Sequence, residues 1–440
     1  MNNIYSDLRQ LIAIGSVRQP AQPHMPFGEL VDQALDAMLS ICHREGLTTY
    51  KDPKGYYGYA QIGQGSNLFG VLCHLDVVPP GTLSKWQNPP YEMVEDDIWV
   101  YGRGVQDDKG PSLISLHALL DLLKAGYELD RPVRFIFGLD EETNWECVDQ
   151  YIHDEMAIPE MGFVPDGSFP LTYAEKGLWQ VELIREKPDT LEFKAGVALN
   201  VVPGEVVYQN PSTELLSQLK KLDFDLIEQD AEVKVMGKDA HAAFPHDGKN
   251  ALAGLLHALH LSTQTSEAAR FVSEKLYDGI EGEKLFTKRS DEVSGDMTIS
   301  LGLADINMDK QVLGIDIRYP VTIELDHYRK QLMERAAEYG FRVKEISQLD
   351  PLYVDRNSPL VQSLMAAYQT ITGDLDSQPQ ISGGATFARS MKNFVAFGIY
   401  LPGSEESVHQ PNERITKKDM KIAYHIFQQA FKKLVIKEKE

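Results

Sequence analysis

The chain has 440 residues, of which 43% are hydrophobic and 25% are charged, a balance that excludes disordered and fibrous proteins and predicts more than one folded domain. Its 65 acidic and 43 basic residues give a formal net charge of −22, which disfavours nucleic acid and anionic membrane surfaces as partners. The three cysteines form no Cys-x-x-Cys pair, which argues against a disulfide framework and a thiolate zinc site.

The N-terminal residues have neither the basic region nor the apolar region of a secretory signal, and no apolar stretch is long enough to span a bilayer. We therefore expect a cytoplasmic protein with no membrane and no nucleic acid among its partners.

The first part of the sequence alternates buried strands with helices. Residues 68–78 and 133–139 are apolar runs of strand length, and residues 112–125 between them have helical periodicity that ends at Gly126. This alternation predicts an α/β fold, in which helices cover a mostly parallel sheet on both faces.

From about Trp179 the pattern changes to alternating strands near helical segments, for example at residues 232–235 and 311–317. We interpret this part as an inserted α+β lid domain. The predicted domains are a first catalytic segment at 1–179, a lid at 180–350 that is long enough for two similar halves, and a second catalytic segment at 351–440.

The second catalytic segment returns to the first pattern. Residues 394–399 read as another buried strand, and a final amphipathic helix follows Thr416. Thr416 and Asp419 resemble the N-terminal cap of that helix.

Acidic residues and a histidine gather where the predicted strands end. Composition alone would give about 10 adjacent acidic pairs, so position carries more information than any single pair. His74 and Asp76 end one strand, Asp107 lies in a glycine-rich turn, Glu141 and its neighbours end another strand, and Asp166 follows a third apolar run. Strand ends at one sheet edge form the usual ligand site, and so many acids would repel each other there without cations.

Imidazole and carboxylate ligands without thiolate favour zinc, with manganese or cobalt as alternatives. If His74, Asp107, Glu142, Asp166 and His409 bind two divalent ions and share Asp107, the three carboxylates leave one positive charge, which a bridging hydroxide would neutralise. Glu141, beside a ligand but not itself one, would then be the general base.

Four motifs resemble the two-zinc family of aminoacylases, desuccinylases, carboxypeptidase G and dipeptidases, and within it the PepV-like dipeptidase branch. The motifs are CHLDVVP at 73–79, GRGVQDDKGP at 102–111, DEETNW at 140–145 and PDG at 165–167. The resemblance runs from about residue 65 to 180 and returns around His241, Arg318, Gly384 and His409.

The resemblance implies that His74 and Asp166 hold one ion, that Glu142 and His409 hold the other, and that Asp107 bridges them. It also implies that Asp76 orients the imidazole of His74 through the second ring nitrogen. Glu141 would take a proton from the attacking water and give it to the departing amine. A cis peptide bond between Asp107 and Asp108 is expected as well.

In the lid, the resemblance implies that His241 stabilises the oxyanion and that Asn200 and Arg318 hold the substrate, Arg318 by its terminal carboxylate. Gly383 and Gly384 belong to a glycine turn whose backbone approaches the substrate. The length of the lid favours an active monomer that hydrolyses dipeptides or very short peptides.

Two alternative functions stay open on sequence grounds. One is an amidohydrolase of the same architecture that cuts N-acyl or N-succinyl amino acids, because the predicted metal site would serve both reactions. The other is an inactive metal-dependent peptide-binding protein, which the presence of every proposed ligand and of Glu141 disfavours.

Overall fold

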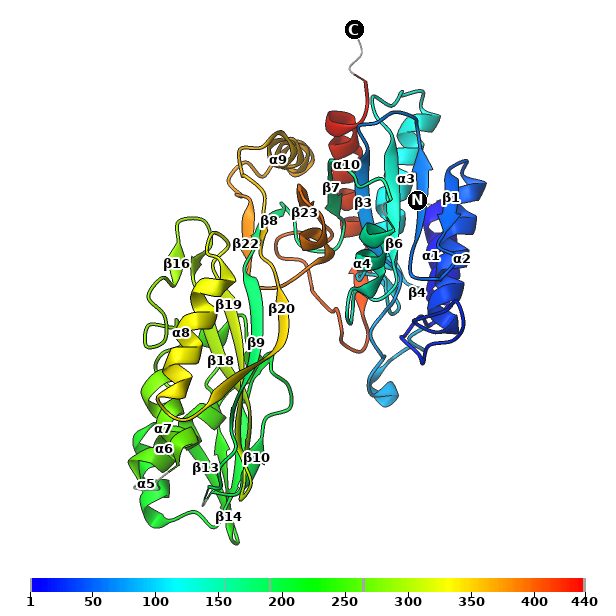
Figure 1. Cartoon of the computed structure of the whole chain (residues 1–440). Coiled ribbons are helices and arrows are strands. Elements are labelled where there is room, and N and C mark those ends of the chain that lie inside the picture. The colour runs from blue at the N-terminus through cyan, green and yellow to red at the C-terminus, as the bar shows by residue number, and fades with distance from the viewer. Residues whose placement is uncertain (1, 155, 190, 263–265, 438–440) are drawn as a thin grey trace. The chain divides into compact units, whose positions relative to one another are not determined.

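The computed structural model describes residues 2–154, 156–189, 191–262 and 266–437, which belong to two compact units (Figure 1). The first unit contains the chain up to Tyr173, Tyr353–Gln380 and the chain from Ala385 onward, and the second contains Ala174–Leu352 and Ile381–Gly384. The domain boundaries proposed from the sequence, at 179/180 and 350/351, stay a prediction.

A mixed sheet organises the first unit, with the strand order β1-β2-β6-β3-β7-β23-β8-β21 and β22 paired to β8. Its strands are β1 (Thr48–Lys51), β2 (Gly58–Ile62), β3 (Phe69–His74), β6 (Val133–Gly138), β7 (Met161–Val164), β8 (Thr172–Glu175), β21 (Leu352–Tyr353), β22 (Gln380–Ser382) and β23 (Phe394–Ala396). The central strands β6, β3, β7 and β23 are parallel, whereas β1, β2 and β8 pair in the antiparallel sense. The predicted α/β class is confirmed, with antiparallel strands added at the edges.

The helices of the first unit are α1 (Asn2–Ile12), α2 (Glu29–Arg44), α3 (Lys109–Lys124), α4 (Glu146–His153), α9 (Pro359–Thr372) and α10 (Lys417–Leu434), with the short turns η1 (Leu83–Lys85) and η4 (Phe387–Ser390). A small sheet of β24 (Arg414–Thr416), β5 (Trp99–Tyr101) and β4 (Val94–Glu95) stands apart from the main one. Figure 1 shows α3 and α10 beside the central strands, and α3 contacts both β3 and α10.

The observed elements differ from the predicted ones mainly at their ends. Helix α3 begins at Lys109 rather than at residue 112, because Pro111 falls in its first turn, where a missing N–H costs no helical hydrogen bond. Strand β3 ends at His74, so Asp76 lies in the loop beyond it. The predicted stop at Gly126 is confirmed by its left-handed φ of 85°.

One further difference and one confirmed prediction concern the second half of the first unit. Strand β23 stops at Ala396, before Gly398, whose positive φ of 96° breaks the extended conformation. The predicted cap of α10 is confirmed, since the hydroxyl of Thr416 accepts from the backbone N–H of Asp419 at 2.9 Å.

Phe163 on β7 is the centre of the aromatic core of the first unit. Its ring centroid lies 5.9 Å from Phe69, 5.6 Å from Phe397, 5.6 Å from Phe427 and 5.7 Å from Phe431. These contacts join β7 to β3, to the residue that follows β23 and to α10. The core therefore fixes the sheet edge at which the predicted site residues follow their strands.

The second unit is built on a separate antiparallel sheet with the order β10-β18-β19-β9-β20. These strands are β9 (Gly177–Arg185), β10 (Phe193–Ala195), β18 (Thr298–Ile306), β19 (Gln311–Tyr319) and β20 (Arg342–Leu349). Smaller sheets pair β11 (Val201–Val202) with β15 (Ala240–His241), β16 (Ser290–Asp291) with β17 (Gly295–Asp296), and β12 (Glu205–Gln209) and β13 (Asp225–Gln229) with β14 (Glu232–Met236).

The helices of the second unit are α5 (Thr213–Lys221), α6 (Ala251–Leu261), α7 (Glu267–Phe271) and α8 (Leu325–Ala337), with the turns η2 (Pro245–Asp247) and η3 (Val272–Leu276). Helices α6, α7 and α8 lie along the strands (Figure 1) and share one buried apolar cluster with them. The predicted inserted α+β region is therefore confirmed as a unit with its own core; that it consists of two similar halves stays a prediction. No helix within the described ranges is both long and apolar enough to cross a membrane.

Candidate metal centre

The predicted ligands of the first unit follow the carboxyl ends of neighbouring parallel strands. His74 is the last residue of β3, Glu142 follows β6, and Asp166 follows β7. Because these strands are parallel, their carboxyl ends meet at one edge of the sheet. Asp107, just before α3, and His409, in the loop before β24, complete the set.

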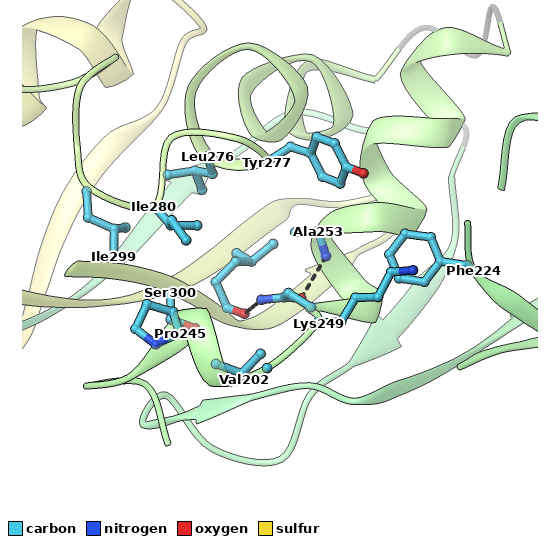
Figure 2. Close-up of a pocket in the computed structure, with 13 residues that line it drawn as sticks. Val202, Phe224, Pro245, Lys249, Ala253, Leu276, Tyr277, Ile280, Ile299 and Ser300 are labelled. Carbon is cyan, nitrogen blue, oxygen red and sulfur yellow. Dashed lines mark hydrogen bonds between the residues drawn. The ribbon is translucent and has the colours of Figure 1, made fainter. Parts of the chain in front are cut away.

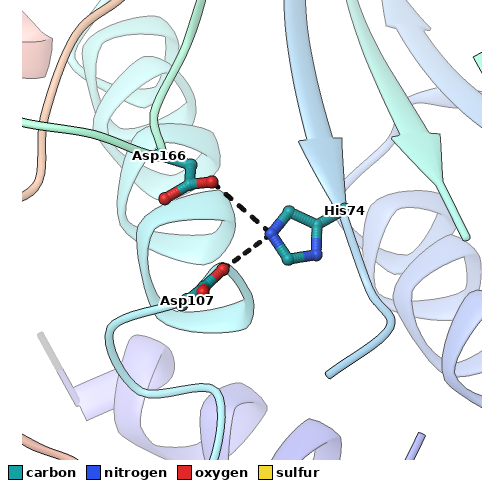
Figure 3. Close-up of side chains that lie close together, drawn as sticks. All are labelled: His74, Asp107 and Asp166. Carbon is teal, nitrogen blue, oxygen red and sulfur yellow. Dashed lines mark ion pairs between the residues drawn. The ribbon is translucent and has the colours of Figure 1, made fainter. Parts of the chain in front are cut away.

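The five side chains form two groups that share Asp107. In the first, His74 Nε2 lies 2.7 Å from Asp107 Oδ1 and 3.6 Å from Asp166 Oδ2. Figure 3 shows the ring of His74 directed at both carboxylates. In the second, His409 Nε2 lies 3.1 Å from Asp107 Oδ2 and 3.1 Å from Glu142 Oε2. Within each group the candidate ligand atoms lie within 4.8 Å of one another.

The residues present fit a pair of divalent ions. His74 Nε2 and Asp107 Oδ1 are buried and face each other at 2.7 Å, yet no contact of either atom with the described residues has the geometry of a hydrogen bond. Orphaned atoms of this kind are costly unless something satisfies them. Imidazole and carboxylate donors without thiolate are the ligand types that zinc, manganese and cobalt accept.

The pKa shifts of the metal-free cluster also indicate a site for cations. Burial and the charge of Asp107 raise the pKa of Glu142 to about 7, and burial followed by Asp107 raises that of Asp166. Hydrogen bonds to Asp107 and Glu142 raise the pKa of His409 to about 10. Burial alone would lower the pKa of His74, but the neighbouring carboxylates, Asp107 first, outweigh it and raise this pKa well above its ordinary value. Without cations, protons balance the carboxylates.

Glu141 lies beside the two groups and belongs to neither. Burial, together with the charges of Asp166 and Glu142, raises the pKa of its carboxyl well above the ordinary value, although His74 opposes the shift. Its main chain is fixed, since its carbonyl accepts from Trp145 Nε1 at 2.7 Å. A buried carboxyl with a raised pKa next to the ligand groups is suited to accept and pass on a proton.

Asp76 contacts the imidazole of His74 and also holds the loop of the two glutamates. The Nδ1 atom of His74 lies 3.1 Å from the backbone carbonyl of Asp76 and 3.5 Å from its carboxylate. That carboxylate accepts from the backbone N–H groups of Glu141 and Glu142 at 3.2 and 3.1 Å. The nearer partner of the imidazole is thus the main chain, and the carboxylate links His74 to the glutamates.

Two buried acids with positioning contacts had no role in the sequence prediction. Asp108 accepts from the backbone N–H of His74 at 3.1 Å and from the hydroxyl of Ser112 at 2.9 Å, and so fixes Asp107 from its C-terminal side. Asp140 accepts from the first two backbone N–H groups of α4. The hydrogen bond between Asp108 and Ser112 could have been predicted from the sequence, because a serine four residues later lies one helical turn away. The peptide bond between Asp107 and Asp108 is cis, as predicted.

The remaining predicted site residues belong to the second unit. His241, on β15, accepts at Nδ1 from the backbone N–H of Ala243 at 3.1 Å, and burial followed by the charge of Arg318 lowers its pKa. A neutral imidazole that accepts at Nδ1 carries its proton on Nε2, where it can be donated. His241 therefore has the protonation state of a hydrogen-bond donor.

Arg318 is buried and makes a two-contact ion pair with Asp316, from Nε to Oδ1 at 2.6 Å and from Nη2 to Oδ2 at 3.1 Å. Its Nη1 donates to the carbonyl of Gly383 at 2.9 Å. The second unit thus brings Arg318 and the predicted glycine turn together. Gly384 donates its N–H to the hydroxyl of Ser382 at 2.9 Å.

Asn200 is exposed, and its backbone carbonyl accepts from the backbone N–H of Ala242, next to His241, at 2.9 Å. The loop of Asn200 therefore lies against the segment that carries His241.

Comparison with known proteins identifies the class to which this fold and site belong. The sequence profile of peptidase family M20/M25/M40 matches residues 70–433, which include all five candidate ligands. The chain therefore belongs to this peptidase family.

Individual relatives agree with the family. The chain is 34% identical over 464 residues to a protein of Staphylococcus aureus (strain MW2) named "Putative dipeptidase MW1694", covering 99% of this chain and 98% of that protein. Among solved structures, its fold is similar to an M20 family metallo-carboxypeptidase from Sulfolobus solfataricus, with a TM-score of 0.61, 18% identity and coverage of 98% and 99%. Human carnosine dipeptidase 1 is similar at a TM-score of 0.60, with 15% identity and coverage of 98% and 96%.

Proposed function

We propose that this chain is a metal-dependent dipeptidase that hydrolyses the peptide bond of dipeptides or very short peptides. The observation that carries the proposal is the convergence of two imidazoles and three carboxylates in two groups that share Asp107. Membership of a peptidase family and the name of the Staphylococcus aureus relative support peptides as the substrate.

We assign His74 and Asp166 to one divalent ion, Glu142 and His409 to the other, and Asp107 to both. Zinc fits the donors best, and manganese or cobalt would also be accepted. When bound, such ions would polarise the scissile carbonyl and lower the pKa of the attacking water.

The proton transfers are assigned to Glu141. Its carboxylate would accept a proton from the attacking water and donate it to the leaving amine, which a carboxyl with a raised pKa can do near neutral pH. Asp76 would hold Glu141 and Glu142 in position relative to His74, because it contacts the imidazole of His74 and the backbone N–H groups of both glutamates.

The second unit would recognise the substrate. His241 would donate a hydrogen bond from its Nε2–H group to the oxyanion, because Nδ1 is already an acceptor. Arg318 would bind the terminal carboxylate of the peptide, with Asn200, Gly383 and Gly384 as neighbouring contacts. A carboxylate clamp at a fixed position would limit the enzyme to short peptides, because longer ones would place their carboxylate elsewhere.

We further propose that the chain is active as a monomer, with His241 and the metal ligands supplied by the same chain. Sedimentation at assay concentration, together with activity over a dilution series, tests this assignment. Specific activity that falls on dilution in step with dissociation of a dimer would contradict it.

The central experiment compares substrates on zinc-loaded protein. We expect hydrolysis of dipeptides, falling steeply for tripeptides and tetrapeptides, and little hydrolysis of N-acetyl or N-succinyl amino acids. Chelator-treated protein is the control for metal dependence. Preference for the N-acylated substrates would contradict the dipeptidase assignment while leaving the metal centre intact.

A further inference from the structure

Glu413 is a fully buried carboxylate that lies four residues after His409 and belongs to neither group of candidate ligands. Its Oε2 accepts from Arg103 Nη1 at 2.7 Å, and its Oε1 accepts from the backbone N–H groups of Gly104 and Gln106 at 3.0 and 2.9 Å. Both oxygens therefore hold the loop that leads into Asp107.

The main chain around Glu413 makes the same connection. Its carbonyl accepts from the N–H of Gly102 at 3.0 Å, and the following strand β24 pairs with β5, which ends directly before that loop. Residues 413–416, which follow His409, are thus hydrogen-bonded to residues 99–102, which precede Asp107.

Gln106 makes a second connection, on the other side of His409. Its Nε2 donates to the carbonyl of Glu405 at 2.8 Å, and its Oε1 accepts from the N–H and the hydroxyl of Ser407 at 2.9 and 3.0 Å. The hydroxyl of Ser407 in turn accepts from the N–H of Arg414 at 3.0 Å and so closes the loop that carries His409. We call Arg103, Gln106, Ser407 and Glu413 the clasp.

His409 depends on such support more than the other candidate ligands do. Its side chain is 54% exposed, and its backbone has a left-handed φ of 59°, which non-glycine residues adopt uncommonly. The contacts described for its imidazole are those with Asp107 and Glu142. Asp107, by contrast, is also held from its other side through Asp108.

We propose that Glu413 is a positioning residue of the metal centre, which sets His409 against Asp107 by joining their two loops through the clasp. The affinity for the ion assigned to Asp107, Glu142 and His409 then depends on a carboxylate that binds no ion. The inference rests on the proposed two-ion centre. It predicts a selective effect, because the position of Asp107 relative to His74 does not depend on the clasp alone.

The test is a titration of metal-free protein with Zn²⁺ in competition with a chromophoric chelator, with thermal unfolding recorded for each variant. In Glu413→Gln the amide NH₂ must face Arg103 or backbone N–H groups, so contacts of the clasp are lost. We expect the ion assigned to Asp107, Glu142 and His409 to lose about 10- to 100-fold in affinity, as is usual when an outer partner of a ligand is removed, with the other ion changed much less.

Two matched controls separate positioning from general destabilisation. Asp7→Asn also removes a buried charge in the first unit, where Asp7 pairs with His117 at 2.9 Å, and Ser404→Ala removes a hydroxyl from the same loop, where it donates to Asp419. Both should bind two ions as the unmodified protein does. Ser407→Ala, which removes a clasp hydroxyl without disturbing a buried charge, should weaken the same ion as Glu413→Gln.

The outcomes are distinguishable. Folded Glu413→Gln with unchanged affinity for both ions, or with both weakened equally, would overturn the clasp and leave the two-ion centre standing. If Glu413→Gln fails to fold, the result for Ser407→Ala decides, and unchanged binding in that variant overturns the clasp. Fewer than two ions on the unmodified protein would overturn the proposed centre itself and the clasp with it.

Discussion

Zinc binding to the metal-free protein should release protons, because the ligand cluster carries them when no cation is present. At pH 7 the imidazoles of His74 and His409 are both protonated, since the pKa of the first is raised well above its ordinary value and that of the second to about 10. Glu142, with a pKa of about 7, is half protonated. These three groups contribute about 2.5 protons for two ions. The carboxyls of Glu141 and Asp166, whose pKa values are raised as well, and a bound water can only add to that release.

The sign of the pH dependence follows from the same shifts. A cation displaces a proton only where the pH lies below the metal-free pKa, so the release should fall as the pH rises and the affinity should increase. By pH 9 Glu142 contributes almost nothing, while His409 still contributes most of one proton.

Calorimetric titration with zinc at constant pH, in three buffers of different ionisation enthalpy, measures the release as the slope of the observed enthalpy against the buffer enthalpy. His409→Asn is the control and should release about one proton fewer at pH 7. A release below one proton at pH 7, or a release that grows with pH, would refute the arrangement of imidazoles and carboxylates described above.

Glu141→Gln should keep its metal and lose about 10²- to 10⁴-fold in kcat, or about 2.7 to 5.4 kcal/mol, since only the proton transfer is removed. Glu142→Gln should instead lose metal, and equal metal loss in both variants would contradict this assignment of the two glutamates. Arg318→Ala leaves the buried carboxylate of Asp316 without its counter-charge, with only the amide of Gln180 as a described side-chain partner, and should lower the free energy of unfolding by about 3–5 kcal/mol in urea titrations. The exposed ion pair removed in Arg329→Ala should cost less than about 1 kcal/mol. Phe163→Ala should cost about 3–5 kcal/mol of stability by the same measurement, and a loss below about 1 kcal/mol would contradict its central place in the core.

The central strands could be predicted because their physics is local. Strands β3 and β6 are buried at every position, so they appear in the sequence as apolar runs, interrupted only by Arg134 in β6 and ended by His74 in β3. Their neighbours in the sheet could not be predicted in this way. Strand β23 lies between β7 and β8, more than 200 residues away in the chain, and such pairing leaves no periodic trace.

The candidate site shows the same division. His74, Glu142 and Asp166 were predicted from their positions after apolar strands, whereas His409 lies in a loop without periodicity and came from the family resemblance alone. The partner of Arg318, in contrast, could be predicted from the sequence. Asp316 is two residues away on a strand, and residues two apart point to the same face.

The insertion of β23 between β7 and β8 also bears on the order in which the chain becomes structured during synthesis. The strands of the five-stranded sheet all lie within residues 177–349, so that sheet can close early, whereas the first unit keeps a gap beside β7 until residues 394–396 have left the ribosome. An open sheet edge of this kind invites pairing with other chains. His409 emerges later still, so a nascent chain can carry a finished second unit well before it can complete the group of Asp107, Glu142 and His409. Delay before residues 394–396 are synthesised therefore leaves the β7 edge open, and a chaperone that shields this edge would act in that interval.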